Sequence, residues 1–199
     1  SVGRYLANPA AYESSEFFGT ALVTRGRLRE RIVALNEKAL RALGMRDGVT
    51  HLELFHTPDD ELVFCEVAGR PAGGGIPAVT ETQYGINIVE ISLRIQAGLN
   101  VQLPPRDSGA TGRVCGFAAF YPGPHDGRGI DASSFDTYGI VEHSHHPGAG
   151  DDKGGVRHST DFRDVYVVAA RDARTLEEKI SQLRREYHGS AIDCRSEEE

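Results

Sequence analysis

The sequence predicts an α+β fold in which helices pack against an antiparallel sheet. Apolar residues recur every three or four positions over 27–43, over 83–97 and from residue 175 onward, a spacing typical of amphipathic helices. Short runs of strand-forming residues occupy five segments: 20–24, 49–56, 62–68, 113–121 and 163–170. A polar turn over 58–61 joins two of these runs, which favours an antiparallel hairpin.

The first predicted helix, over 27–43, has the clearest pattern in the chain. Gly44 stands where a C-cap belongs, and the apolar stripe contains Leu28, Ile32, Leu35, Ala39 and Leu43. The second predicted helix, over 83–97, ends at Gly98 and places three isoleucines inward: Ile88, Ile91 and Ile95.

A linker is expected over 104–112, which is rich in Pro, Gly and Asp. Beyond it, the last predicted helix starts with Thr175 as its N-cap, and Glu178 completes a capping box. Its buried stripe should contain Leu176, Ile180, Leu183 and Tyr187. We therefore expect one domain over 1–103 and a small α+β domain over 104–199.

Composition narrows the class of protein. The 199 residues carry 29 acidic and 22 basic side chains, and this excess of negative charge argues against a nucleic-acid partner. No apolar run is long enough to cross a bilayer, so no membrane association is expected. The three dispersed cysteines are expected to be free thiols, which favours the cytoplasm. A homodimer is compatible with the sequence, which does not fix the oligomeric state.

The predicted hairpin brings two glutamates together. With a turn centred between Asp59 and Asp60, residues whose numbers sum to 119 pair across the strands. Glu53 then faces Glu66, and the same register sets Phe55 against Phe64 and His51 against Ala68. His51, Glu53 and Phe55 share one face of their strand because side chains alternate.

Two carboxylates placed opposite each other repel, so some positive charge must compensate them. A shared divalent cation would do so, since Mg²⁺ prefers carboxylate oxygens and completes its shell with water or phosphate oxygens. Arg70 reaches the same face if the strand continues by two residues, and a guanidinium there could stabilise a transferring phosphoryl group. The alternative is an ordinary solvent-exposed face in which Arg70 neutralises the two glutamates.

The segments 48–55 (GVTHLELF) and 62–74 (LVFCEVAGRPAGG) resemble the metal-binding hairpin of the ATP-grasp enzymes, and the similarity extends over about residues 20–103. The remainder is similar, more loosely, to the small β-rich domain that follows the ATP-grasp fold in carboxylate–amine ligases. The resemblance implies the C-terminal part of such a ligase.

The resemblance also implies roles for individual residues. Glu53 and Glu66 would bind Mg²⁺ (or Mn²⁺) that bridges the phosphates of ATP, and Arg70 would lie over the acyl-phosphate and tetrahedral intermediates. Gly73 and Gly74 would line the pocket for a small-molecule carboxylate and amine. His51, beside the metal face, is a further candidate for substrate binding.

Two departures from the family pattern stand out. Ala68 occupies the position where the family usually has an asparagine that also binds metal. The half of the fold that clamps the nucleotide should precede residue 20, so the chain by itself is expected not to turn over ATP. The alternative is a non-catalytic module of the same ancestry that binds a metal or a partner through a histidine-rich loop.

That histidine-rich stretch contains the densest set of potential ligands: Glu142, His143, His145, His146, Asp151, Asp152 and His158. His143 and His145 would share a face if the backbone there is extended, which is one element of a transition-metal site. The adjoining glycine-rich sequence favours a loop. The other glycine-rich stretch, 72–76, is followed by Pro77, so it is not expected to lead into a helix as a phosphate-binding loop does.

Overall fold

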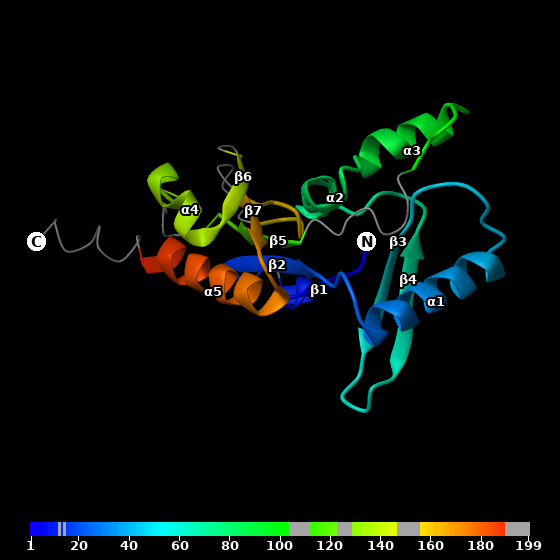
Figure 1. The fold of residues 1–199 in the computed structure, drawn as a ribbon, viewed down its shortest axis with the longest axis horizontal. Helices are drawn as coiled ribbons and strands as arrows, with labels where there is room; N and C mark the ends of the chain where they lie inside the picture. Colours follow the sequence, from blue (N-terminus) through cyan, green and yellow to red (C-terminus); the bar gives the residue numbers. More distant parts are fainter. Residues whose placement is uncertain (12, 14, 104–111, 123–128, 147–155, 190–199) are drawn as a thin grey trace, which may run out of the picture.

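The computed structural model of the 199-residue chain describes residues 1–11, 13, 15–103, 112–122, 129–146 and 156–189. Its strands form a five-stranded antiparallel sheet and a separate two-stranded hairpin, with helices packed around them (Figure 1). The predicted α+β class is therefore confirmed. Short helical turns complete the fold: η1 (Pro9–Ala11), η2 (Ala132–Ser134) and α4 (Phe135–Tyr138).

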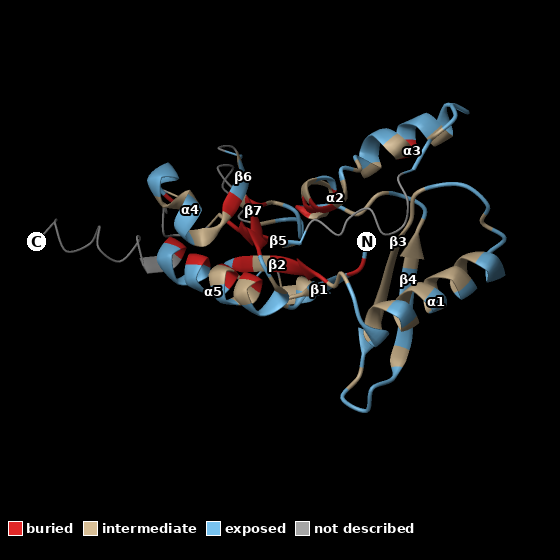
Figure 2. Ribbon diagram, in the orientation of Figure 1, coloured by how far each residue is buried: buried red, intermediate tan, exposed pale blue. Residues whose placement is uncertain are grey.

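The five-stranded sheet has its best-buried strands in the middle. Its spatial order is β1 (Gly3–Tyr5), β2 (Phe17–Leu22), β5 (Val114–Phe120), β7 (Asp164–Ala170) and β6 (Ile140–His145). Successive residues of β5 enter two different apolar clusters, with Ala118 and Phe120 in one and Phe117 and Ala119 in the other. Because strand side chains alternate, these clusters lie on opposite faces of the sheet. Both faces of the sheet are therefore covered (Figure 2).

Helix α5 (Ala173–Gly189) covers one face, and its predicted apolar stripe is buried as expected. The Tyr187 ring stacks on Phe120 with 3.7 Å between ring centroids. The predicted capping box is wrong: Asp172, just before the helix, accepts a hydrogen bond from the Thr175 backbone N–H at 2.7 Å. Glu178 pairs instead with Arg174, one helical turn earlier.

The region between 76 and 97 contains two helices, α2 (Ile76–Tyr84) and α3 (Ile88–Gln96), where one was predicted. Gly85 adopts a left-handed conformation that ends α2, and the Asn87 side chain caps α3. Pro77 lies in the first turn of α2, where its missing N–H has no helical partner to lose. The expectation that no helix follows the 72–76 loop is therefore wrong.

The hairpin of β3 (His51–His56) and β4 (Leu62–Ala68) lies to one side of the large sheet, with α1 (Arg27–Ala42) beside it (Figure 1). No residue of these three elements is fully buried (Figure 2). Arg31 of α1 binds Asp60 in the hairpin turn at 2.7 Å. The hairpin is thus much more exposed than the sheet.

The large sheet joins segments from both sides of the predicted domain boundary. Residues 17–21 of β2 pair with 116–120 of β5, and β1 extends the sheet beyond β2. The predicted linker lies outside the described residues apart from Gly112, and the division at residue 103 stays a prediction. Cys65 and Cys115 are free thiols. None of the helices in the described ranges combines the length and apolar composition needed to cross a membrane.

Candidate functional site: the glutamate hairpin

The structure confirms that Glu53 and Glu66 are cross-strand partners, and it pairs His51 with Ala68 as predicted. The predicted pairing of Phe55 with Phe64 is wrong. The register shifts by one residue between Glu53 and Leu54, so Phe55 faces Val63.

Cys65 is the extra residue that accounts for this shift, because Phe64 pairs with Leu54 and Glu66 pairs with Glu53. Such a β-bulge bends a strand and re-aims its side chains. The bulge separates the half of the hairpin that carries the two glutamates from the half near the turn, whose phenylalanines Phe55 and Phe64 are exposed.

Tyr5 is a site residue that sequence reasoning missed. Its hydroxyl donates a hydrogen bond to Glu53 Oε1 at 2.5 Å and so joins the edge strand β1 to the hairpin. Burial, followed by this bond to the Glu53 carboxylate, raises the Tyr5 pKa well above its usual value, so the phenol remains a donor at neutral pH. The two residues are 48 positions apart, and no local pattern indicates their contact.

Arg70 carries a charge that partly opposes the rise in the Tyr5 pKa, whereas the charge of Glu66 adds to it. The Arg70 Nη1 donates to the Pro71 carbonyl at 3.0 Å, and the residue is exposed. No ion pair joins Arg70 to either glutamate in the described part of the structure, so its guanidinium is available to an anion.

His51 lies beside Glu53, with 3.7 Å between its Nε2 and Glu53 Oε1. Its Nδ1 is buried, and no described residue provides it with a hydrogen-bond partner. The His51 imidazole therefore lies beside Glu53, and no hydrogen bond to Glu53 holds the ring in place.

The glycine loop that follows Arg70 lies against the aromatic face of the large sheet. Gly74 has a left-handed backbone (φ 60°), and a Cβ there would lie 3.2 Å from the Phe162 ring. A Cβ on Gly73 would lie 3.6 Å from Thr160. Both predicted pocket glycines thus lie in the segment that connects the hairpin strand β4 to helix α2. Whether they contact a substrate stays a prediction.

The donor set of the hairpin suits a hard divalent cation. Within the described ranges, no third His, Cys, Asp or Glu completes a compact ligand cluster with Glu53 and Glu66. Mg²⁺ is commonly bound by one or two protein carboxylates, and its other ligands are waters and substrate phosphates. Glu53 is half-exposed, Glu66 is exposed, and the two occupy paired positions, which fits this pattern. Ala68 adds no further ligand.

The histidine-rich stretch is not a loop throughout, contrary to expectation. His143 and His145 lie on strand β6 and share a face, and both contact Asp164 on β7. Asp151 and Asp152 lie outside the described residues, and Glu142, His146 and His158 do not join this cluster. Sequence reasoning missed Asp164, although it lies within the predicted strand over 163–170 and a carboxylate is unusual in a buried strand.

Comparisons with known proteins agree with the resemblance to the ATP-grasp enzymes. No protein-family model matches the sequence. A curated relative, the L-arginine-specific L-amino acid ligase of Bacillus subtilis, is 38% identical over 64 residues, which are 32% of this chain and 16% of that protein.

Among solved structures, L-amino acid ligase from Bacillus licheniformis has a TM-score of 0.61 and 18% identity, with 87% of this chain and 43% of that chain aligned. Phosphoribosylglycinamide synthetase from Anaerococcus prevotii has a TM-score of 0.60 and 15% identity, covering 84% of this chain and 44% of that one. The chain spans less than half the length of these structures. It therefore has the fold of the ATP-grasp carboxylate–amine ligases and carries one part of it.

Proposed function

We propose that this chain is part of an ATP-dependent ligase that joins a small carboxylate to an amine. The observation that carries the proposal is the cross-strand pair Glu53–Glu66, which puts two carboxylates on one face of an open hairpin. The fold shared with ligases supports it. The reaction has two steps: the carboxylate attacks the γ-phosphate of ATP to give an acyl phosphate and ADP, and the amine then displaces phosphate to form the C–N bond.

In this proposal Glu53 and Glu66 hold Mg²⁺ or Mn²⁺. Bound there, the cation would supply positive charge beside the phosphates of ATP, which favours transfer of the terminal phosphoryl group. Tyr5 supports this role because its hydrogen bond occupies one side of Glu53 Oε1 and fixes the carboxylate. Ala68 would leave this ligand to water, because the ATP-grasp pattern that the hairpin resembles has asparagine at this position.

Arg70 is the proposed stabiliser of the acyl phosphate and of the tetrahedral intermediate. The residue is exposed, and its Nη1 donates a hydrogen bond to the neighbouring Pro71 carbonyl. A bidentate guanidinium stabilises negative charge that develops on transferred oxygens. Catalysis would rest mainly on positioning and charge neutralisation, with Gly73, Gly74 and His51 bordering the substrates.

An amino acid is the first acid to test, because the Bacillus subtilis relative is named for arginine. The protein that carries this chain should release phosphate from ATP when an amino acid and an amine are supplied together with Mg²⁺. Glu53→Gln and Glu66→Gln should each lower this rate by at least about 100-fold, as loss of a key electrostatic group typically does.

The matched control is Glu61→Gln, which removes an exposed carboxylate from the turn of the same hairpin. It should leave the rate unchanged. Calorimetric titration of Mg²⁺ with ATP would show binding lost in the Glu53 and Glu66 variants and retained in the control. Activity that survives both substitutions would refute the proposed role of the pair.

The second candidate function is a non-catalytic module of the same ancestry that binds metal at its histidines. Two observations favour it: Ala68 in place of a metal-binding amide, and the His143–His145–Asp164 cluster away from the hairpin. The two candidates differ in whether Mg²⁺ with ATP binds at the glutamate pair. Dependence on Glu53 and Glu66 for Mg²⁺ with ATP supports the ligase.

A further inference from the structure

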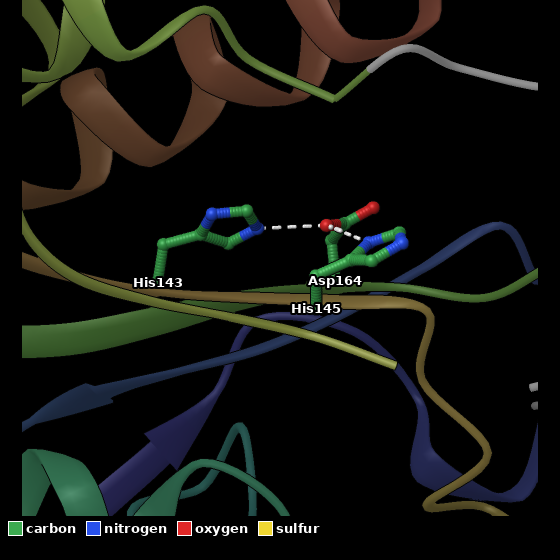
Figure 3. Close-up of side chains that lie close together, drawn as sticks. All are labelled: His143, His145 and Asp164. Carbon is green, nitrogen blue, oxygen red and sulfur yellow. Dashed lines mark hydrogen bonds and ion pairs between the residues drawn. The ribbon is translucent and has the colours of Figure 1, made fainter. Parts of the chain in front are cut away.

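We propose that His143, His145 and Asp164 form a binding site for a divalent transition metal of the Zn²⁺ type, separate from the glutamate hairpin. Each residue offers one ligand atom, and these atoms all lie within 4.8 Å of one another. Figure 3 shows both imidazole rings directed toward the carboxylate of Asp164. Two imidazoles and one carboxylate are a donor set used by open, three-ligand zinc sites.

The sheet itself brings the three residues together. His145 and Asp164 are direct cross-strand partners in the β6–β7 ladder, and His143 is two residues earlier on the same face of β6. A register shift between Ile140 and Glu142 precedes them and sets which residues of β6 face Asp164. The ligands therefore stand on two paired strands, which hold their backbone positions more firmly than a loop would.

Neighbouring side chains fix the orientation of two ligands. The His143 ring stacks on Tyr166 at 4.3 Å with 5° between the planes, and it meets the Phe135 ring edge-on at 5.9 Å. The Tyr187 hydroxyl donates to Asp164 Oδ2 at 2.7 Å, which leaves Oδ1 directed at the histidines. A hydrogen bond to the outer oxygen of a ligating carboxylate is a common support of metal sites.

The distances are close to those of a metal-bound state. His143 Nε2 lies 2.7 Å and His145 Nδ1 lies 2.9 Å from Asp164 Oδ1. Around a tetrahedral Zn²⁺ the ligand atoms lie roughly 3.3 Å apart, given metal–ligand distances of about 2.0 Å. The site would therefore need to expand by about half an ångström, which rotation of the two imidazoles can supply.

The protons at the site also balance when a metal ion replaces the two hydrogen bonds to Asp164. An ionised Asp164 only accepts hydrogen bonds, so both imidazoles donate to it from the nitrogens that face it. A metal ion would take the place of these two protons. Each neutral imidazole can carry its proton on the other ring nitrogen instead, so coordination requires two tautomer changes and no other reactant.

Exposure shows which ligands a metal could reach. The Asp164 side chain is 2% exposed, whereas those of His143 and His145 are 26% and 49% exposed. Asp164 accepts three hydrogen bonds, and a cation entering from the histidine side would replace two of them with its positive charge. Water would complete the coordination. Imidazole ligands favour Zn²⁺, Co²⁺ or Ni²⁺ over Mg²⁺.

The test is a titration of the full chain with Co²⁺ and Zn²⁺. One equivalent of Co²⁺ should give a visible absorption spectrum with imidazole coordination, and Zn²⁺ should displace it. His145→Ala and His143→Ala should each weaken Zn²⁺ binding by more than about 10-fold, since loss of an outer partner alone costs that much. Tyr187→Phe should weaken it by about 10-fold, because only the support of Asp164 is lost.

His146→Ala is the matched control, since this exposed histidine adjoins the cluster without belonging to it. Zn²⁺ affinity should be unchanged in this variant and in Glu53→Gln, which keeps the result independent of the proposed ligase site. Circular dichroism checks that each variant is folded. Absence of Zn²⁺ binding, or binding equally affected by His146→Ala and His145→Ala, would overturn the proposal.

Discussion

At the scale of single residues, two tyrosine hydroxyls show how much a buried polar group depends on its partner. Tyr187 donates to the buried carboxylate of Asp164 at 2.7 Å. The hydroxyl of Tyr84 is also buried, but no described residue forms a hydrogen bond with it. Removing a paired hydroxyl leaves its partner unsatisfied, whereas removing an unpaired one relieves a desolvation cost.

We therefore expect Tyr187→Phe to lower the free energy of unfolding by about 1–3 kcal/mol and Tyr84→Phe to leave it unchanged or raise it by up to about 1 kcal/mol. Urea denaturation at pH 7 measures both. Equal destabilisation by the two substitutions would contradict this assignment of partners.

Tyr84 should also make the free energy of unfolding depend on pH, because its pKa differs between the folded and the unfolded chain. Burial raises the pKa of its phenol above the usual value near 10, so the folded protein keeps a proton that the unfolded chain loses. This raised pKa lowers stability as pH rises above about 10. The stability advantage of Tyr84→Phe over the wild type should accordingly grow between pH 9 and pH 11 in urea denaturation.

At the scale of elements, the glycine loop between β4 and α2 is constrained by the sheet beneath it. Gly75 is buried at the start of α2, and a Cβ there would lie 2.5 Å from the Phe117 ring. Phe117 is itself fully buried, so it cannot move aside cheaply. This contact explains why the loop requires glycine here for packing, apart from any role in binding.

Gly75→Ala should therefore lower the free energy of unfolding by about 1–3 kcal/mol, as overpacking of a core does. Gly69→Ala is the matched control, because a Cβ at Gly69 meets nothing within 4 Å and its backbone φ is not positive. The control should be neutral within about 0.5 kcal/mol. Equal urea midpoints for the two variants would show that the loop repacks freely.

The elements also show what the sequence could predict. The apolar stripe of α5 and the Glu53–Glu66 register follow from local periodicity and from the length of one turn, so both were predictable. The bulge at Cys65 was not, because the alternation of the hairpin is equally compatible with a regular ladder. The break at Gly85 was missed because a single glycine is tolerated within a helical pattern.

At the scale of the whole molecule, the contacts that sequence reasoning missed join distant segments. Tyr5 reaches Glu53 only because β1 lies at the edge of a sheet whose next strands are β2 and β5. Asp164 meets His145 only because β6 and β7 pair antiparallel. Such contacts follow from topology, which local patterns do not contain, so one residue of each site, Tyr5 and Asp164, remained hidden until the fold was known.

The same topology predicts uneven stability across the molecule. Strands β5 and β7 are almost entirely buried, whereas α1, β3 and β4 contain no fully buried residue. Segments with few buried apolar contacts open at lower free energies, and their amide protons exchange faster. Hydrogen exchange followed by mass spectrometry should therefore show rapid exchange in α1 and the hairpin and slow exchange in β5 and β7.

Mg²⁺ with ATP should then slow exchange in β3 and β4 and leave β5 and β7 unchanged, because a ligand that binds only the closed form suppresses opening of the segment it contacts. Glu66→Gln should abolish this protection, and Glu61→Gln should retain it. Zn²⁺ should instead protect the ends of β6 and β7 that carry His145 and Asp164. Protection by both metals at one common segment would contradict two separate sites, since the hairpin and the β6–β7 edge belong to different sheets.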